Sequence, residues 1–173
     1  MLKKKKIRIN TKIGDVFYVK VDDNNKKHFQ YIVSDITQLN SDVIRAFKET
    51  YPIDNNPDLS EIVKGEVEFY AHCVTKLGLK MNLWEKVGNT TEIGSTIQIL
   101  FRDTNDYGSM VGDEPIRISR NWYVWRVNDN DFTRVGKLEG ENRNAEIGIV
   151  VNPYDILDRI RAGTYKFLYP GFE

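Results

Sequence analysis

The sequence is poor in the residues that build metal and redox sites. It has one cysteine, Cys73, and two histidines, His28 and His72. A single cysteine can form neither an internal disulfide nor a thiolate metal centre, and it fits a reducing cytoplasm. The histidines show no H-x-H or H-E-x-x-H spacing, and a metal site needs three or four convergent ligands. A makeshift site would require the two histidines to lie on neighbouring strands. We therefore expect no metal or other cofactor, and an inert, buried Cys73.

Net charge and long apolar runs are also missing. Twenty-five basic residues balance twenty-five acidic ones, so no long-range field attracts nucleic acid or an anionic membrane. The longest apolar runs, such as IGIVV at 147–151, are far shorter than the ~20 residues that cross a bilayer. The N-terminal MLKKKKIRIN lacks the ~7–15 apolar residues of a signal peptide. We expect a soluble, cytoplasmic protein whose lysines at 3–6 form a solvated tail.

Motifs for catalysis are scarce as well. The sequence contains no G-x-S-x-G elbow, phosphate loop or dinucleotide fingerprint. The stretch DTNDYGSMVGDE at 103–114 approaches the calcium-loop template, but Tyr107 stands where a side-chain oxygen should coordinate, and the preceding LFR is typical of a strand. An ordinary loop is favoured over weak calcium binding. Both readings place Asp103 and Asp106 at a sheet rim, accessible to a partner.

Alternating apolar residues indicate a mainly β protein. They predict a hairpin with strands over 15–21 and 26–34, joined by turn formers at 22–25, and a strand over 6–10 before it. Further strands are expected at 42–48, 67–74, 83–87, 97–102, 121–127 and 146–151. Segment 67–74 also fits a helical spacing. Segment 121–127 is apolar on both faces, as in a central strand, and Trp84, Trp122 and Trp125 are expected in the core.

Two segments carry the start and stop signals of helices. They are NPDLSEIVKG at 56–65 and NPYDILDRIRAG at 152–163. In each, asparagine can cap the first turn, proline suits the first helical position, and the final glycine can adopt the left-handed stop conformation. The sequence therefore predicts one α+β domain over 1–173, a mostly antiparallel, strongly curved β-sheet or partial barrel with two short helices.

Several blocks of sequence resemble a known family. They are HFQYIVSDITQLNSDVIRAFK at 28–48, FYAHCV at 69–74, LWEKVGN at 83–89, LFRDTNDYG at 100–108, NWYVWRV at 121–127, GKLEGENRNAEIGIVVNP at 136–153 and LYPGFE at 168–173. In these blocks the chain resembles the immunity protein 26 family. The resemblance implies a bacterial protein that binds and neutralises a cognate toxin protein. Some members carry a phosphotriesterase label, which implies a metal-dependent hydrolase as an alternative. A small-molecule-binding module is a third possibility.

A charged loop supplies the remaining candidates for a binding surface. LEGENRNAE at 138–146 concentrates Glu139, Glu141, Arg143 and Glu146. It is either a solvated loop with an internal ion pair or a rim that steers a basic toxin surface. The predicted partner-binding residues are Asp103, Asp106, Glu139, Glu141 and Arg143, and no catalytic residue is predicted.

Overall fold

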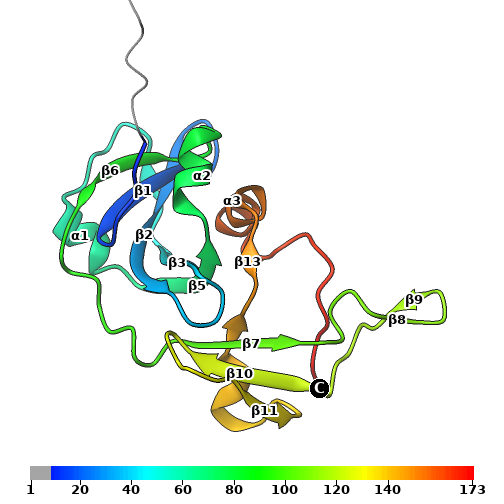
Figure 1. Cartoon of the computed structure of the whole chain (residues 1–173). Helices are drawn as coiled ribbons and strands as arrows, with labels where there is room; N and C mark the ends of the chain where they lie inside the picture. Colours follow the sequence, from blue (N-terminus) through cyan, green and yellow to red (C-terminus); the bar gives the residue numbers. More distant parts are fainter. Residues whose placement is uncertain (1–8) are drawn as a thin grey trace, which may run out of the picture.

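The fold is α+β, with most of its regular structure in strands. The computed structural model describes residues 9–173, so the expected lysine tail and the strand expected over 6–10 lie wholly or largely outside it. The larger sheet has seven strands: β1 (Asp15–Lys20), β2 (Asn25–Asp35), β3 (Ser41–Phe47), β4 (Tyr51–Pro52), β5 (Val67–Cys73), β6 (Glu85–Asn89) and β13 (Val150–Val151). Its order is β13-β5-β3-β2-β1-β6, with β4 paired to β2 (Figure 1).

A smaller sheet and a separate hairpin complete the β-structure. The smaller sheet has the order β11-β10-β7-β12, with β7 (Leu100–Thr104), β10 (Trp122–Arg126), β11 (Thr133–Gly136) and β12 (Glu146–Ile147). The hairpin joins β8 (Met110–Val111) to β9 (Glu114–Pro115). The helices are α1 (Leu59–Val63), α2 (Thr75–Lys80), α3 (Pro153–Ala162) and the 3-10 turn η1 (Gly140–Asn144). The expected interior place of segment 121–127 is confirmed, because β10 lies between β11 and β7.

The predicted β1–β2 hairpin is confirmed. The Asp22 carboxylate accepts the backbone N–H groups of Asn24 and Asn25, each at 2.8 Å, which holds the turn. Phe17 lies opposite Phe29 in the antiparallel register, and their rings stack with centroids 5.0 Å apart. This pair occupies the centre of the main core cluster, which also contains Trp84.

The predicted strong curvature is wrong. Within residues 9–173 the sheets are open and mixed, with β13 parallel to β5 and β12 parallel to β7 among otherwise antiparallel pairs. The chain covers the apolar face of the large sheet with a helix, so the sheet does not need to close on itself. β13 runs directly into α3, where Ile156, Leu157 and Ile160 are buried in the same cluster as Phe17.

The helices follow the predicted signals only in part. Asn152 accepts the Tyr154 N–H at 2.9 Å and Gly163 ends α3 in the left-handed conformation, as predicted. The first helix is shorter than predicted: α1 begins after Asp58, so Asn56 is not its cap. The Asn56 side chain instead accepts a hydrogen bond from Lys26. A third α-helix, α2, was not predicted; its N-cap residue, Val74, makes no side-chain bond and the helix contains a glycine, so its start carries no helix signal.

The predicted strand over 146–151 is two strands in different sheets. The two strands are separated at Gly148. The Trp125 ring lies so close to this residue that a Cβ atom there would be 2.1 Å from it, so only glycine fits. The residues before the glycine pair with β7, and those after it pair with β5. The chain therefore crosses from the small sheet to the large one beneath Trp125. The expected burial of all three tryptophans is confirmed, with exposures of 1–3%.

Candidate functional site

The predicted partner-binding residues all belong to the small sheet and its loops, but they differ in what holds them. Asp103 lies on β7 and accepts hydrogen bonds from the hydroxyls of Tyr169 at 2.8 Å and Tyr123 at 3.2 Å. Burial raises the pKa of this half-buried carboxyl group, while these hydrogen bonds oppose the rise. Asp103 therefore connects β7 to β10 and to the C-terminal segment. Its role in binding a partner stays a prediction.

Asp106 organises the loop that leads from β7 to the hairpin. Its carboxylate accepts from the Ser119 hydroxyl at 2.7 Å and from the Asn121 side chain at 3.2 Å. Ser119 is buried and also bonds to the Thr104 hydroxyl at 2.8 Å. Both ends of the segment between residues 104 and 121 are thereby fixed to each other. The segment leaves the small sheet and returns to it as a defined loop.

Glu139, Glu141 and Arg143 lie in or beside η1 and are exposed. Arg143 does not form the expected ion pair with a glutamate of its own loop. Glu141 instead lies 3.7 Å from Arg126 on β10. Arg143 donates to the main-chain oxygen of Glu173 and lies over the Phe172 ring, 4.9 Å from its centroid. The arginine therefore holds the C-terminal segment against the loop.

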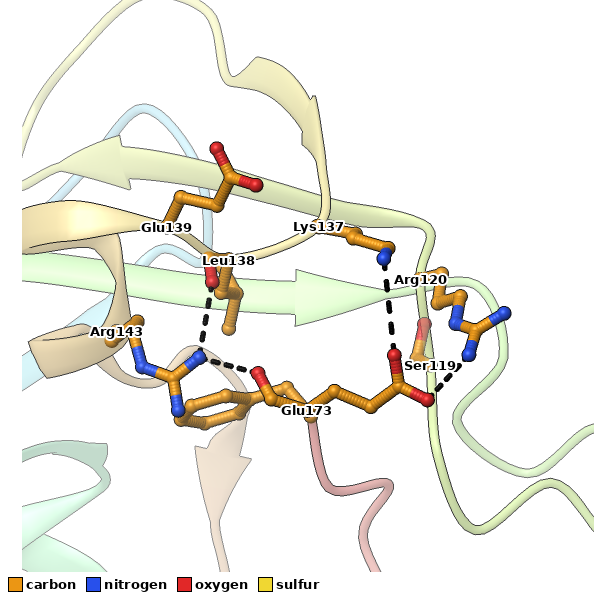
Figure 2. A pocket seen from close by; sticks show the side chains of 8 residues that line it. Ser119, Arg120, Lys137, Leu138, Glu139, Arg143 and Glu173 are labelled. Atoms are coloured by element: carbon orange, nitrogen blue, oxygen red, sulfur yellow. Dashed lines mark hydrogen bonds and ion pairs between the residues drawn. The ribbon is translucent and has the colours of Figure 1, made fainter.

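A cavity of about 180 Å³ opens between this loop and the C-terminal segment. Ser119, Arg120, Lys137, Leu138, Glu139, Arg143, Phe172 and Glu173 line it. Figure 2 shows the Glu173 carboxylate facing the cationic groups of Arg120 and Lys137. The Glu139 side chain points away from the Glu173 carboxylate. Most of the cationic groups of the cavity therefore already have partners within the protein.

The β8–β9 hairpin is the most exposed apolar feature of this region. In the hairpin, Val111 is 71% exposed and Met110 54%, and Ile118, three residues after it, is 51% exposed. Figure 1 shows the hairpin extending away from both sheets. At its tip, Gly112 adopts a positive φ of 62°, and the exposed acids Asp113 and Glu114 follow it. An exposed apolar group flanked by charged residues is typical of a protein interaction site.

The sequence alone did not single out this apolar hairpin. The residue pattern of this segment favours an ordinary Asp/Asn/Gly loop over a calcium loop, and neither interpretation gives Met110 and Val111 a role in binding a partner. The available signal was the pair of apolar residues directly before Gly112 and Asp113, a combination typical of a hairpin turn. The exposed acids Asp113 and Glu114 supply the negative charge next to Met110 and Val111, and the exposed Arg117 follows three residues later.

The two histidines lie on β2 and β5, which β3 separates, so they do not form a common site. No group of three or more His, Cys, Asp or Glu side chains suited to a metal ion occurs within residues 9–173. Burial raises the pKa of the Cys73 thiol well above its usual value.

His72 contacts the Ser41 hydroxyl through Nδ1 at 3.0 Å, and its Nε2 lies 3.6 Å from an Asp35 carboxylate oxygen. The three side chains resemble a hydrolytic triad in composition only. Asp35 and His72 are fully buried, and Ser41 is 9% exposed, which leaves its hydroxyl inaccessible to a substrate. Burial lowers the pKa of His72 to about 4, against the opposing effect of Asp35. We interpret this set as a polar part of the core.

Comparison with known proteins adds no relative. No family model, curated protein or solved structure matches the chain. The resemblance to the immunity protein 26 family therefore stays a prediction. In the part of the chain that the structure describes, no helix has the length and apolar character needed to cross a bilayer.

Proposed function

We propose that this protein binds and neutralises a bacterial toxin in the cytoplasm, with the β8–β9 hairpin as the centre of its binding surface. The observation that carries the proposal is the hairpin's exposed apolar pair, Met110 and Val111, next to the acids Asp113 and Glu114. The toxin as partner rests on the resemblance to the immunity protein 26 family.

The chemistry of the hairpin specifies the partner surface. Apolar side chains at the centre of an interface contribute most of the affinity, while charged residues at its rim mainly raise the association rate and select partners. An acidic rim around Met110 and Val111 fits a toxin surface with an apolar depression surrounded by lysine or arginine. Asp106 supports this arrangement, because its bonds to Ser119 and Asn121 join the two ends of the projecting segment.

The other predicted binding residues lie beyond the hairpin, and Glu141 pairs with Arg126, which lies opposite Leu100 at the end of β7 remote from the hairpin. Glu139 and Glu141 add negative charge beside β10, and Arg143 holds the C-terminal segment in place. Inhibition would follow from steric occlusion, since a folded surface that covers the toxin's active cleft excludes its substrate.

The test is growth rescue and binding, with the product of the neighbouring gene as the candidate toxin. The wild-type protein should relieve growth arrest and bind the purified toxin in a stoichiometric complex. Val111→Lys should weaken the complex by at least about tenfold and abolish rescue, because it places a positive charge where the partner is apolar and basic. Ile97→Lys is the matched control, since Ile97 is 73% exposed but lies outside the hairpin.

Each result has a distinct meaning. Loss of binding in Val111→Lys but not in Ile97→Lys supports the hairpin as the interface. Equal binding by both variants would remove the hairpin from the proposal. Failure of the wild-type protein to bind or to rescue would contradict the toxin-neutralising function.

A further inference from the structure

A second cavity, far from the hairpin in sequence and built on the large sheet, contains polar groups that the proposed function does not use. It has a volume of about 180 Å³ and is lined by Tyr18, Lys26, His28, Asn56, Pro57 and Val87. These residues come from β1, β2 and β6 and from the segment that precedes α1. Figure 1 shows these elements on the opposite side of the molecule from β8 and β9.

Lys26 is a buried cation with only neutral partners. Its side chain is 4% exposed, and its ammonium group donates to the Ile53 carbonyl oxygen at 3.0 Å and to the Asn56 side-chain oxygen at 3.3 Å. It also lies 5.1 Å from the centroid of the Tyr18 ring. Within the described part of the chain, no carboxylate lies within ion-pair distance of this ammonium group. A buried charge without a counter-charge is unfavourable unless something else compensates it.

His28, beside Lys26, has an unused ring nitrogen. Its side chain is 2% exposed, and its Nδ1 atom has no hydrogen-bond partner among residues 9–173. The ring is held edge-on against Tyr51, with centroids 5.3 Å apart. Burial and the charge of Lys26 lower the pKa of His28 to about 4, so the ring is neutral at pH 7. Nδ1 is sealed from solvent, so the ring nitrogen that a group in the cavity can reach is Nε2, which has no hydrogen-bond partner among residues 9–173 either. Buried polar groups in native proteins nearly always have a partner, so His28 calls for one.

We propose that this cavity binds a small oxyanion, held by the Lys26 ammonium group, the His28 imidazole and the Asn56 side-chain amide. The Asn56 oxygen already accepts from Lys26, which leaves its NH₂ group to donate to the anion. An oxyanion would supply both the counter-charge for Lys26 and an acceptor for the His28 ring N–H. The volume exceeds that of a few water molecules and suits a group the size of phosphate or acetate.

Two acidic residues act on the tyrosines around the cavity. Burial and then Glu85 raise the pKa of the Tyr18 hydroxyl, and burial and then Glu61 raise that of Tyr51. Both carboxylates act on the hydroxyl ends of the tyrosines.

The test uses the NMR signals of the wild-type protein's two histidines. Titration with inorganic phosphate should shift the His28 imidazole signals saturably, while His72, buried elsewhere in the core, serves as the internal reference. Sodium chloride at matched ionic strength should leave both sets unchanged, and a parallel titration with acetate shows whether a carboxylate is accepted as well as a phosphate. Shifts of His28 with either oxyanion support the proposal. A folded wild-type protein with no saturable shift would overturn it.

Two variants locate the bound anion. Lys26→Met should lower phosphate affinity by about tenfold or more, because it removes a charge-assisted hydrogen bond. Lys27→Met is the matched control, since Lys27 points to the other face of β2 and pairs with Glu68 at 2.6 Å. Unchanged affinity in a folded Lys26→Met, or equal losses in the two variants, would contradict the site. The wild-type titration decides the question if Lys26→Met does not fold.

Discussion

Replacing Gly78 by alanine tests the packing of the least predictable helix, α2. In an exposed helix this change stabilises the folded state, because alanine exceeds glycine in helix propensity by up to about 1 kcal/mol. Here an added Cβ atom would lie 1.9 Å from Cζ2 of Trp84. No pair of non-bonded carbon atoms tolerates that distance, so either the helix or the indole must move. We therefore expect the sign of the propensity effect to be reversed.

The indole cannot move freely. Trp84 is 3% exposed, its ring nitrogen donates to the Thr75 carbonyl oxygen at 3.0 Å, and its ring meets Phe29 edge-on with centroids 5.1 Å apart. Overpacking a well-filled core typically costs about 1–3 kcal/mol, and occasionally more. With such a close contact we place the cost at or above the top of that range, so that a net loss of about 2 kcal/mol remains after the propensity gain.

The assay is equilibrium unfolding in urea together with thermal melting. A loss of about 2 kcal/mol corresponds to a fall in Tm of about 4–8 °C for a chain of this size. Gly171→Ala is the control, because the nearest atom to its added Cβ, Ile118 Cδ1, would lie at an ordinary contact distance of 3.4 Å. In the double variant with Trp84→Phe, which removes the clashing ring, Gly78→Ala should cost much less. A Tm for Gly78→Ala equal to or above that of the wild type would refute the reasoning.

Two further predictions concern stability. The free energy of unfolding should fall by about 2–5 kcal/mol between pH 6.5 and pH 4. The reason is that His28 and His72 have pKa values of about 4 in the folded protein, so over this range they bind protons in the unfolded chain but not in the folded one. Urea unfolding at several pH values should show a shallower fall for His72→Gln, and an equal fall in that variant would contradict the assignment. Asn152→Ala should cost about 1 kcal/mol in the same assay, because it removes the cap bond to the Tyr154 N–H. Asp58→Ala, at a cap without a side-chain bond, should cost close to nothing, and equal losses would argue against the cap.

Local signals were sufficient where neighbouring residues determine the structure. The β1–β2 hairpin follows from alternation on both sides of a turn in which Asp22 bonds to the next residues along the chain. Helix α3 follows from Asn152, Pro153 and Gly163, whose roles depend only on their own backbone. Each of these features is decided within about twenty residues of continuous sequence, which is the range over which pattern reasoning works.

The features that were missed depend on contacts between distant segments. Helix α2 is stabilised by Trp84 packing against its glycine, and the break between β12 and β13 exists because Trp125 lies against Gly148. The prediction of a strongly curved sheet was wrong for the same reason. Alternating apolar residues show which face of a strand is buried. Whether the sheet curls on itself or is covered by a helix depends on where α3 packs.

The candidate site shows the same division. Sequence reasoning identified the acidic loops, and Glu139 and Glu141 are exposed, as a rim requires. It did not reveal that Asp103 is engaged by Tyr169, which lies 66 positions later in the chain. Nor did it single out Lys26 and His28, because a strand lysine and a strand histidine are ordinary until their burial and their neighbours are known.

The two proposed sites are built on different sheets, which makes their effects separable. The hairpin continues from β7 of the small sheet, whereas the oxyanion cavity uses β1, β2 and β6 of the large one. The sheets meet where His72 packs on Phe101, with ring centroids 4.2 Å apart, in the cluster that also contains Trp125. Because packed aromatic cores of this kind deform little, an anion at Lys26 has no evident route to alter the hairpin. A change in toxin binding on Lys26→Met would therefore mean that the toxin itself contacts the large sheet.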